Sequence, residues 1–123
     1  MSNSTPAVRN WRAISALFGL SAVALAAIAA HALPDMKAAQ AVERAAIMQL
    51  VHAVLLLYMA GLTGICSRLA RWSTLIGLML FCGGIYAKYL LGLASAASVA
   101  PVGGMAMMIG WLLLGLSSLT KDN

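Results

Sequence analysis

The sequence predicts an all-α integral membrane protein whose four transmembrane helices form a compact antiparallel bundle. Of its 123 residues, 63% are hydrophobic and only 9% are charged, and the mean hydropathy is +0.93. A soluble domain of this size leaves much of its surface in water, so it could not hide so much apolar area. Four long apolar stretches divide the chain, and each can cross a hydrocarbon core of about 30 Å, which takes about 20 helical residues.

The first helix is predicted over residues 11–33, after a polar tail over residues 1–10. Pro34 ends it, because proline cannot continue an α-helix without losing a backbone hydrogen bond. A cleaved signal peptide is the alternative, since basic residues precede the stretch and small residues surround His31. The apolar run is longer than the usual core of a signal peptide, about 7–15 residues, which favours a transmembrane helix.

The second helix is predicted over residues 46–66. Residues 34–45 before it hold two acids and two bases, and their alanine-rich part is suited to a short helix at the membrane surface. The basic segment SRLAR, residues 67–71, follows as a short turn. The second and third helices should therefore form an antiparallel hairpin.

The third helix is predicted over residues 72–95 and begins with Trp72, a residue type enriched at membrane surfaces. The fourth is predicted over residues 101–119 and begins at a proline, which is favoured in the first turn of a helix. Residues 120–123 form a short tail. An even number of spans places both termini on one side of the membrane.

The basic residues indicate which side this is. Positively charged residues are enriched in cytoplasmic loops. With the termini inside, the outer segments carry two basic residues balanced by two acids, whereas the inner segments carry Arg9, Arg12, Arg68, Arg71 and Lys121. We therefore expect a multi-pass protein of the cytoplasmic membrane with both termini in the cytoplasm.

Cys66 and Cys82 are predicted to be unpaired. Cys66 falls at one membrane surface, whereas Cys82 lies about 15 Å deep in the next helix, at about 1.5 Å per residue. That separation exceeds the reach of a disulfide. Both are interpreted as small apolar residues.

Polar residues within the apolar stretches are the candidate site. Gln49 and His52 lie about 60° apart on one helical face, and ionisable residues inside a membrane usually face the bundle interior. Together with Tyr86 at comparable depth and His31 near the outer membrane surface, they are predicted to form one polar cluster. Its role is open: it is a hydrogen-bonded structural cluster, or a site for a small molecule or lipid headgroup. A metal or haem site is disfavoured, because there are only two histidines and no carboxylate is embedded near them.

A second candidate feature lies on another face of the third helix. Lys88 points about 160° away from Tyr86 but shares a face with Gly77 and Gly84. Glycines allow another helix to approach closely, so Gly77, Gly84 and Lys88 are a candidate interface with a second copy or a partner. The alternatives are that Lys88 reaches to the membrane surface and that the glycines pack within one bundle.

Known catalytic patterns are missing from the sequence. It contains no nucleophile elbow, phosphate-binding loop, HExxH or CxxC. No lysine- or arginine-rich run with interleaved aromatic residues appears, so nucleic acid is not an expected partner. We expect a protein that is not an enzyme and has no cofactor, whose surroundings are the lipid bilayer and either a larger membrane complex or a homo-oligomer.

Four motifs carry a resemblance to a known family. The motifs are AIAAHAL (27–33), MQLVH (48–52), FCGGIY (81–86) and APVGGMAMMIGW (100–111). Through them, residues 12–118 resemble the small membrane proteins of the domain of unknown function 423, whose eukaryotic members are called transmembrane protein 256. The resemblance implies a four-helix integral membrane protein, and the family has no established biochemical activity. Family members often carry a glutamate two residues before the glutamine, where this chain has Ile47. Any role that rests on that acid is therefore not expected here.

These observations predict an accessory, scaffold or assembly protein of the cytoplasmic membrane. The alternative is a carrier of small molecules or lipids that acts as a homo-oligomer, as small drug exporters do. Such exporters depend on a glutamate embedded in their first helix. The acids here are Asp35, Glu43 and Asp122, all predicted to lie in loops or in the tail.

Overall fold

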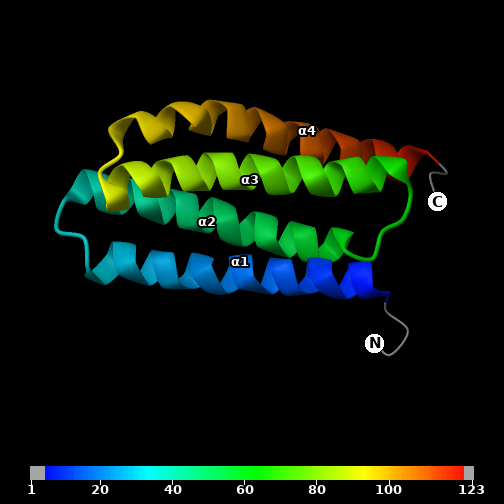
Figure 1. Ribbon diagram of the computed structural model, residues 1–123, viewed down its shortest axis with the longest axis horizontal. Helices are drawn as coiled ribbons and strands as arrows, with labels where there is room; N and C mark the ends of the chain where they lie inside the picture. The colour runs from blue at the N-terminus through cyan, green and yellow to red at the C-terminus, as the bar shows by residue number, and fades with distance from the viewer. Residues whose placement is uncertain (1–4, 121–123) are drawn as a thin grey trace.

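The computed structural model describes residues 5–120, which fold into four long helices joined by short connections (Figure 1). Helix α1 spans Pro6–His31 and α2 spans Met36–Met59. Helix α3 spans Ile65–Leu91, and α4 spans Ala100–Leu119 after the short 3-10 helix η1, Ala94–Val99. Helices α1, α2 and α3 each have the length and hydropathy needed to cross a bilayer, and so does the segment Ala94–Leu119 formed by η1 and α4. The predicted all-α membrane fold is confirmed.

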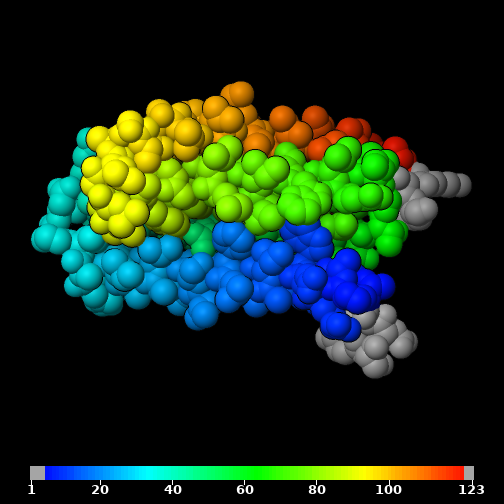
Figure 2. All heavy atoms as spheres, in the orientation of Figure 1, coloured from blue at the N-terminus to red at the C-terminus, as the bar shows by residue number. Residues whose placement is uncertain are grey.

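Successive helices run in opposite directions, so the first and last described residues lie at the same end of the bundle (Figure 1). Backbones pack closely in the pairs α1–α2, α2–α3 and α3–α4, whereas α1 and α4 do not meet. Helix α2 is the most enclosed. Half of the residues in its 18-residue apolar stretch are buried, whereas 17% are buried in the corresponding stretch of α1. In Figure 2, α1 and α3 leave only a strip of α2 visible between them. Helix α2 is therefore the centre of the bundle, and α1 and α4 are its outer helices.

The first helix begins earlier than predicted. Pro6 occupies its first turn, where a missing N–H costs nothing. The hydroxyl of Thr5 accepts a hydrogen bond from the backbone N–H of Val8 at 3.3 Å and caps the helix. Much of the predicted tail over residues 1–10 is therefore helical. Residues 1–4 and 121–123, which include Lys121 and Asp122 of the predicted tail, lie outside the described part of the chain.

The second helix also begins earlier, at Met36 rather than near residue 46. Asp35 caps it by accepting the backbone N–H of Ala38 at 3.2 Å. Ala38, Val42 and Ala45 are buried against the neighbouring helices. The prediction of a separate surface helix in residues 34–45 was wrong, because the charged residues lie on the exposed side of one continuous helix.

The basic turn predicted over residues 67–71 was also wrong. The α2–α3 connection lies over residues 60–64, where Gly64 adopts a φ of 99° that other residues rarely adopt. Arg71 lies inside α3 and reaches back, so that its Nη1 donates to the carbonyls of Met59 at 3.0 Å and Leu62 at 2.8 Å. The arginine thereby bonds the last carbonyl of α2, which has no partner within that helix, and a carbonyl of the connection that follows it.

The third connection follows from Gly92, whose φ of 73° ends α3. The N–H of Leu93 closes the turn by donating to the Ala87 carbonyl at 3.0 Å. The third helix therefore ends before the predicted residue 95, and η1 covers the end of α3 before α4 begins (Figure 2).

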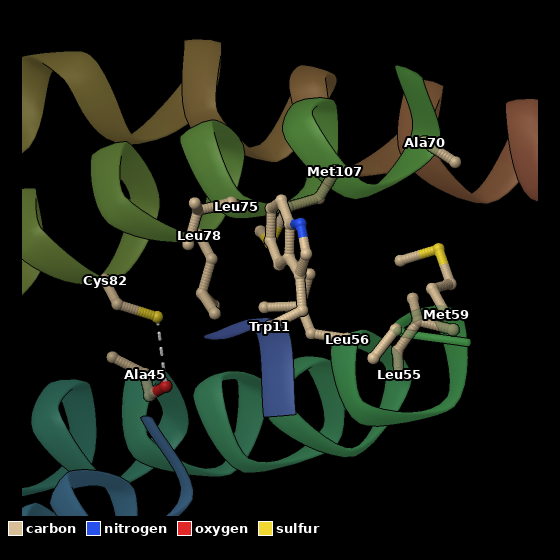
Figure 3. Packing of buried hydrophobic residues seen from close by; sticks show 11 residues of the cluster. Trp11, Ala45, Leu55, Leu56, Met59, Ala70, Leu75, Leu78, Cys82 and Met107 are labelled. Atoms are coloured by element: carbon tan, nitrogen blue, oxygen red, sulfur yellow. Dashed lines mark hydrogen bonds between the residues drawn. The ribbon is translucent and has the colours of Figure 1, made fainter. Parts of the chain in front are cut away.

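The core lies where α2 and α3 meet α1 and α4. Leu56, Met59 and Leu78 are fully buried, and Trp11 of α1 inserts its indole toward them (Figure 3). Cys82 donates to the Ala45 carbonyl at 3.3 Å. Neither cysteine forms a disulfide in the described part of the chain, as predicted.

The helices α3 and α4 approach so closely that glycines are required at their contact. A Cβ atom built at Gly77 would lie 2.6 Å from the Gly103 carbonyl oxygen and 2.7 Å from the Met107 amide nitrogen. A Cβ atom built at Gly110 would likewise collide with the side chain of Thr74. The hydroxyl of Ser73 donates to the Ala106 carbonyl at 2.6 Å and fastens the contact.

We expect Thr74→Val to leave the stability of the protein unchanged or to raise it by up to about 1 kcal/mol. Thr74 is fully buried and its hydroxyl has no hydrogen-bond partner among the described residues, so an isosteric methyl group removes only a desolvated polar atom. Thermal unfolding in detergent measures the difference. Ser73→Ala, which removes a formed hydrogen bond, is the control and should be destabilised; equal losses in both variants would contradict this account.

Candidate functional site

Gln49 of α2 is the centre of a hydrogen-bonded cluster that joins three helices. Its Nε2 donates to the Phe18 carbonyl at 2.8 Å and to the Ser21 hydroxyl at 2.7 Å, both on α1. Its Oε1 accepts the Tyr86 hydroxyl of α3 at 2.8 Å. Gln49 is 3% exposed. Both amide protons and the carbonyl oxygen are therefore used inside the protein.

His52 forms a second cluster, directed toward α4. Its Nε2 lies 3.1 Å from Nε1 of Trp111, and its Nδ1 lies 2.8 Å from the Met48 carbonyl oxygen. An indole nitrogen can only donate, so Nε2 must accept, and the proton is on Nδ1. The two rings meet edge to face, with centroids 6.0 Å apart. These contacts fix the neutral tautomer and use both ring nitrogens.

The predicted cluster of four is therefore divided. Gln49 and Tyr86 meet, whereas His52 contacts a different helix. His31 is exposed in the last turn of α1, and no hydrogen bond between described residues links it to the other three. The division arises because α2 is central: two residues about 60° apart on such a helix face different neighbours.

Sequence reasoning missed two partners in these clusters. Trp111 stands at the end of the motif APVGGMAMMIGW, and Ser21 is one of several small residues in α1. The indole of Trp111 can only donate a hydrogen bond, so its presence in an apolar helix indicated an acceptor on another helix. This was the feature from which the contact could have been predicted. Ser21 gave none, because serine in a membrane helix commonly bonds its own backbone, as its hydroxyl also does here with Phe18 at 3.1 Å.

The candidate interface is occupied by the chain itself. Gly77 contacts α4, and a Cβ at Gly84 would lie 2.8 Å from the Ala96 carbonyl oxygen of η1. These two glycines therefore leave no open path for another helix. Lys88 is half-buried near the end of α3, and its Nζ lies 5.1 Å from the ring centroid of Tyr89.

Metal chemistry has no support in the described residues, which contain no group of three histidine, cysteine or acidic side chains able to hold an ion. Asp35 and Glu43 are exposed in the first part of α2. Ile47, at the position where the resemblance implies an acid, is 55% exposed on the outer side of α2.

The helices and clusters described above define a class: a small multi-pass membrane protein in which the embedded amide and imidazole are bonded between helices. A family profile described as "Protein of unknown function (DUF423)" matches residues 25–104, which is more than half of the chain. The chain belongs to this uncharacterised family of membrane proteins. The match includes His31, Gln49, His52 and Tyr86 and ends before Trp111.

Two relatives agree with this assignment. The chain is 34% identical over 110 residues to a UPF0382 membrane protein of Haemophilus influenzae, across 84% of this chain and 88% of that protein. It is 31% identical over 112 residues to one from Staphylococcus epidermidis, across 86% and 92% respectively. No solved structure matches the chain.

We expect His52→Leu and Trp111→Phe each to lower stability in detergent by about 0.6–2 kcal/mol, the range of hydrogen bonds between membrane helices. Each variant breaks the only side-chain bond that joins α2 to α4 in the described residues. His31→Leu, at an exposed histidine, is the matched control and should change stability little. A His52→Leu protein as stable as wild type that has lost a cellular phenotype would instead indicate a binding site.

Proposed function

We propose that the protein is an accessory, scaffold or assembly component of the cytoplasmic membrane. The observation that carries this proposal is the complete internal bonding of Gln49. A transport or reaction site needs polar groups free to bind a substrate, whereas this amide connects α1, α2 and α3. A rigid bundle with an apolar exterior is suited to lateral contact with other membrane proteins.

Helices α1 and α4 are the surfaces on which a partner would pack. They are separated from each other and carry large exposed side chains, including Leu20 at 69% and Leu112 at 63%. A photoactivated amino acid placed at either position in native membranes tests the proposal. We expect a defined adduct with one other protein from one of the two faces only.

Two results would overturn this proposal. Adducts between two copies of the chain would support the alternative of a homo-oligomeric carrier. An absence of adducts at both positions would indicate that the protein acts alone.

We further propose that both termini lie in the cytoplasm. Arg9, Arg68 and Arg71 lie at the end of the bundle that holds the termini, whereas Lys37 and Arg44 of the opposite end are accompanied by Asp35 and Glu43. An excess of positive charge favours the cytoplasmic side.

Labelling of single cysteines with an impermeant maleimide tests this orientation, in a protein whose Cys66 and Cys82 are replaced by alanine. We expect Lys37→Cys to react in intact cells and Gly61→Cys to react only after the cells are opened. Gly61 suits the purpose because an added Cβ meets no other atom within 4 Å. The reverse pattern would contradict the proposed orientation.

A further inference from the structure

A groove runs between α2 and α4, the two helices that Trp111 and His52 connect. Their backbones do not pack against each other, because both contact α3 instead. Two cavities lie between them, of about 500 Å³ and about 330 Å³, and both are lined by Trp111. The cavities therefore adjoin at Trp111, and we call them the two halves of the groove. Each has the volume of a small-molecule site, about 300–1,000 Å³.

The two halves differ in polarity. The larger half lies at the end of the bundle that holds the termini, and hydroxyl groups line it, from Tyr58, Thr63, Ser67, Ser117 and Ser118. The smaller half lies on the other side of Trp111 and is lined mainly by Met48, Phe81, Met105, Met107 and Met108. His52, whose two ring nitrogens are both bonded within the protein, also lines the smaller half, and no lysine, arginine or acidic side chain of the described residues lines either half.

Ser67 distinguishes the polar half from an ordinary surface depression. The residue is only 3% exposed and lines this cavity. Its hydroxyl makes no hydrogen bond to the described part of the chain, whereas those of Ser117 and Ser118 donate to backbone carbonyls of α4 at 2.7 Å and 2.6 Å. The enclosed polar atoms without a partner in the described residues are those of Arg71 and Thr74, so the Ser67 hydroxyl is open to the cavity, where a ligand can supply its hydrogen-bond partner.

We propose that this groove binds one acyl chain of a membrane amphiphile whose headgroup is small, uncharged and capable of hydrogen bonding. The headgroup lies against Ser67 near the membrane surface, and the chain runs past Trp111 along the methionines, whose flexible side chains adapt to an irregular apolar partner. An anionic headgroup would need basic side chains, and Arg68 and Arg71 line a different cavity, next to α1. This inference goes beyond the proposed function, since an accessory protein needs no bound lipid.

Gly115 provides the variant that tests the groove. It lines the polar half, and a Cβ at this position meets no atom within 4 Å, so Gly115→Leu adds side-chain volume to this half without a clash at its Cβ. Gly19→Leu on α1 is the matched control, because that glycine is equally unobstructed and lies outside the groove. Ser67→Ala removes the hydroxyl without adding volume.

Native mass spectrometry of these proteins measures the bound lipid, after reconstitution in phosphatidylcholine nanodiscs that contain a small molar fraction of mono-oleoylglycerol. We expect the wild type and Gly19→Leu to retain one mono-oleoylglycerol, and Gly115→Leu and Ser67→Ala to retain about fivefold less or lower still, a difference of about 1 kcal/mol in binding. Thermal unfolding shows that each variant is folded.

The proposal is overturned if the wild type retains no mono-oleoylglycerol, or if all four proteins retain equal amounts. It is also overturned if dioleoylphosphatidylglycerol, offered at the same fraction, is retained in preference. None of these results depends on whether the protein has a protein partner, so this proposal and the proposed function are tested separately.

Discussion

Gly77→Ala is expected to lower the free energy of unfolding by about 1–3 kcal/mol, the usual cost of adding a methyl group to a packed interior. The new Cβ would meet the Gly103 carbonyl oxygen at 2.6 Å and the Met107 amide nitrogen at 2.7 Å, and both are backbone atoms of α4. Backbone in a helix cannot rotate away as a flexible side chain does. The two helices must therefore separate, and the bond from Ser73 to the Ala106 carbonyl, at 2.6 Å, is strained with them.

Gly83→Ala is the matched control on the same helix. An added Cβ at Gly83 meets nothing within 4 Å, so that variant should keep its stability or gain about 0.5–1 kcal/mol from the better helix propensity of alanine. Unfolding of the two variants in detergent, followed by circular dichroism, gives the comparison. Similar stabilities would mean that α3 and α4 are not in close contact.

The helices could be predicted from the sequence because their cause is local. Apolar stretches of sufficient length report transmembrane segments directly. Boundaries were less predictable, because capping side chains and glycine conformations decide them. Charge suggested a separate surface helix in residues 34–45 and a turn over residues 67–71. Instead, the first segment is part of α2, which begins after the Asp35 cap, and Arg71 lies within α3 and folds back onto the end of α2.

The candidate site was predicted in part for a related reason. Helical periodicity correctly placed Gln49 and His52 among buried residues, since both are at most 5% exposed. Periodicity gives the direction of a side chain but not the helix that it meets. Which neighbour lies there depends on the packing of all four helices, so the separation of His52 from Gln49 and the pairing with Trp111 could not be derived.

The glycines of α3 show the same limit. Gly77 and Gly84 were correctly recognised as places where a helix approaches closely, but the sequence left open whether that helix belongs to a partner. Contacts with Gly103 and Ala96 show that it belongs to this chain. The face of α3 that carries Gly77 and Gly84 is therefore not available to an oligomer or a partner.

Gln49→Leu is expected to lower the free energy of unfolding by about 1–3 kcal/mol, because one near-isosteric change removes hydrogen bonds to α1 and α3 together. The Tyr86 hydroxyl loses its acceptor, whereas the Phe18 carbonyl and the Ser21 hydroxyl still bond each other at 3.1 Å. Most of the loss should therefore arise at Tyr86. A double-mutant cycle with Tyr86→Phe should show a coupling of about 0.6–1.7 kcal/mol, the range observed between membrane helices.

Gln40→Leu is the matched control for this prediction. It makes the same chemical change in the same helix, but Gln40 is exposed, so its stability should stay within about 0.5 kcal/mol of wild type. Unfolding in mixed detergent micelles measures all four proteins of the cycle and the control. If Gln49→Leu is as stable as Gln40→Leu, the amide does not hold the three helices together, and the internally bonded cluster no longer supports an accessory role over a binding site.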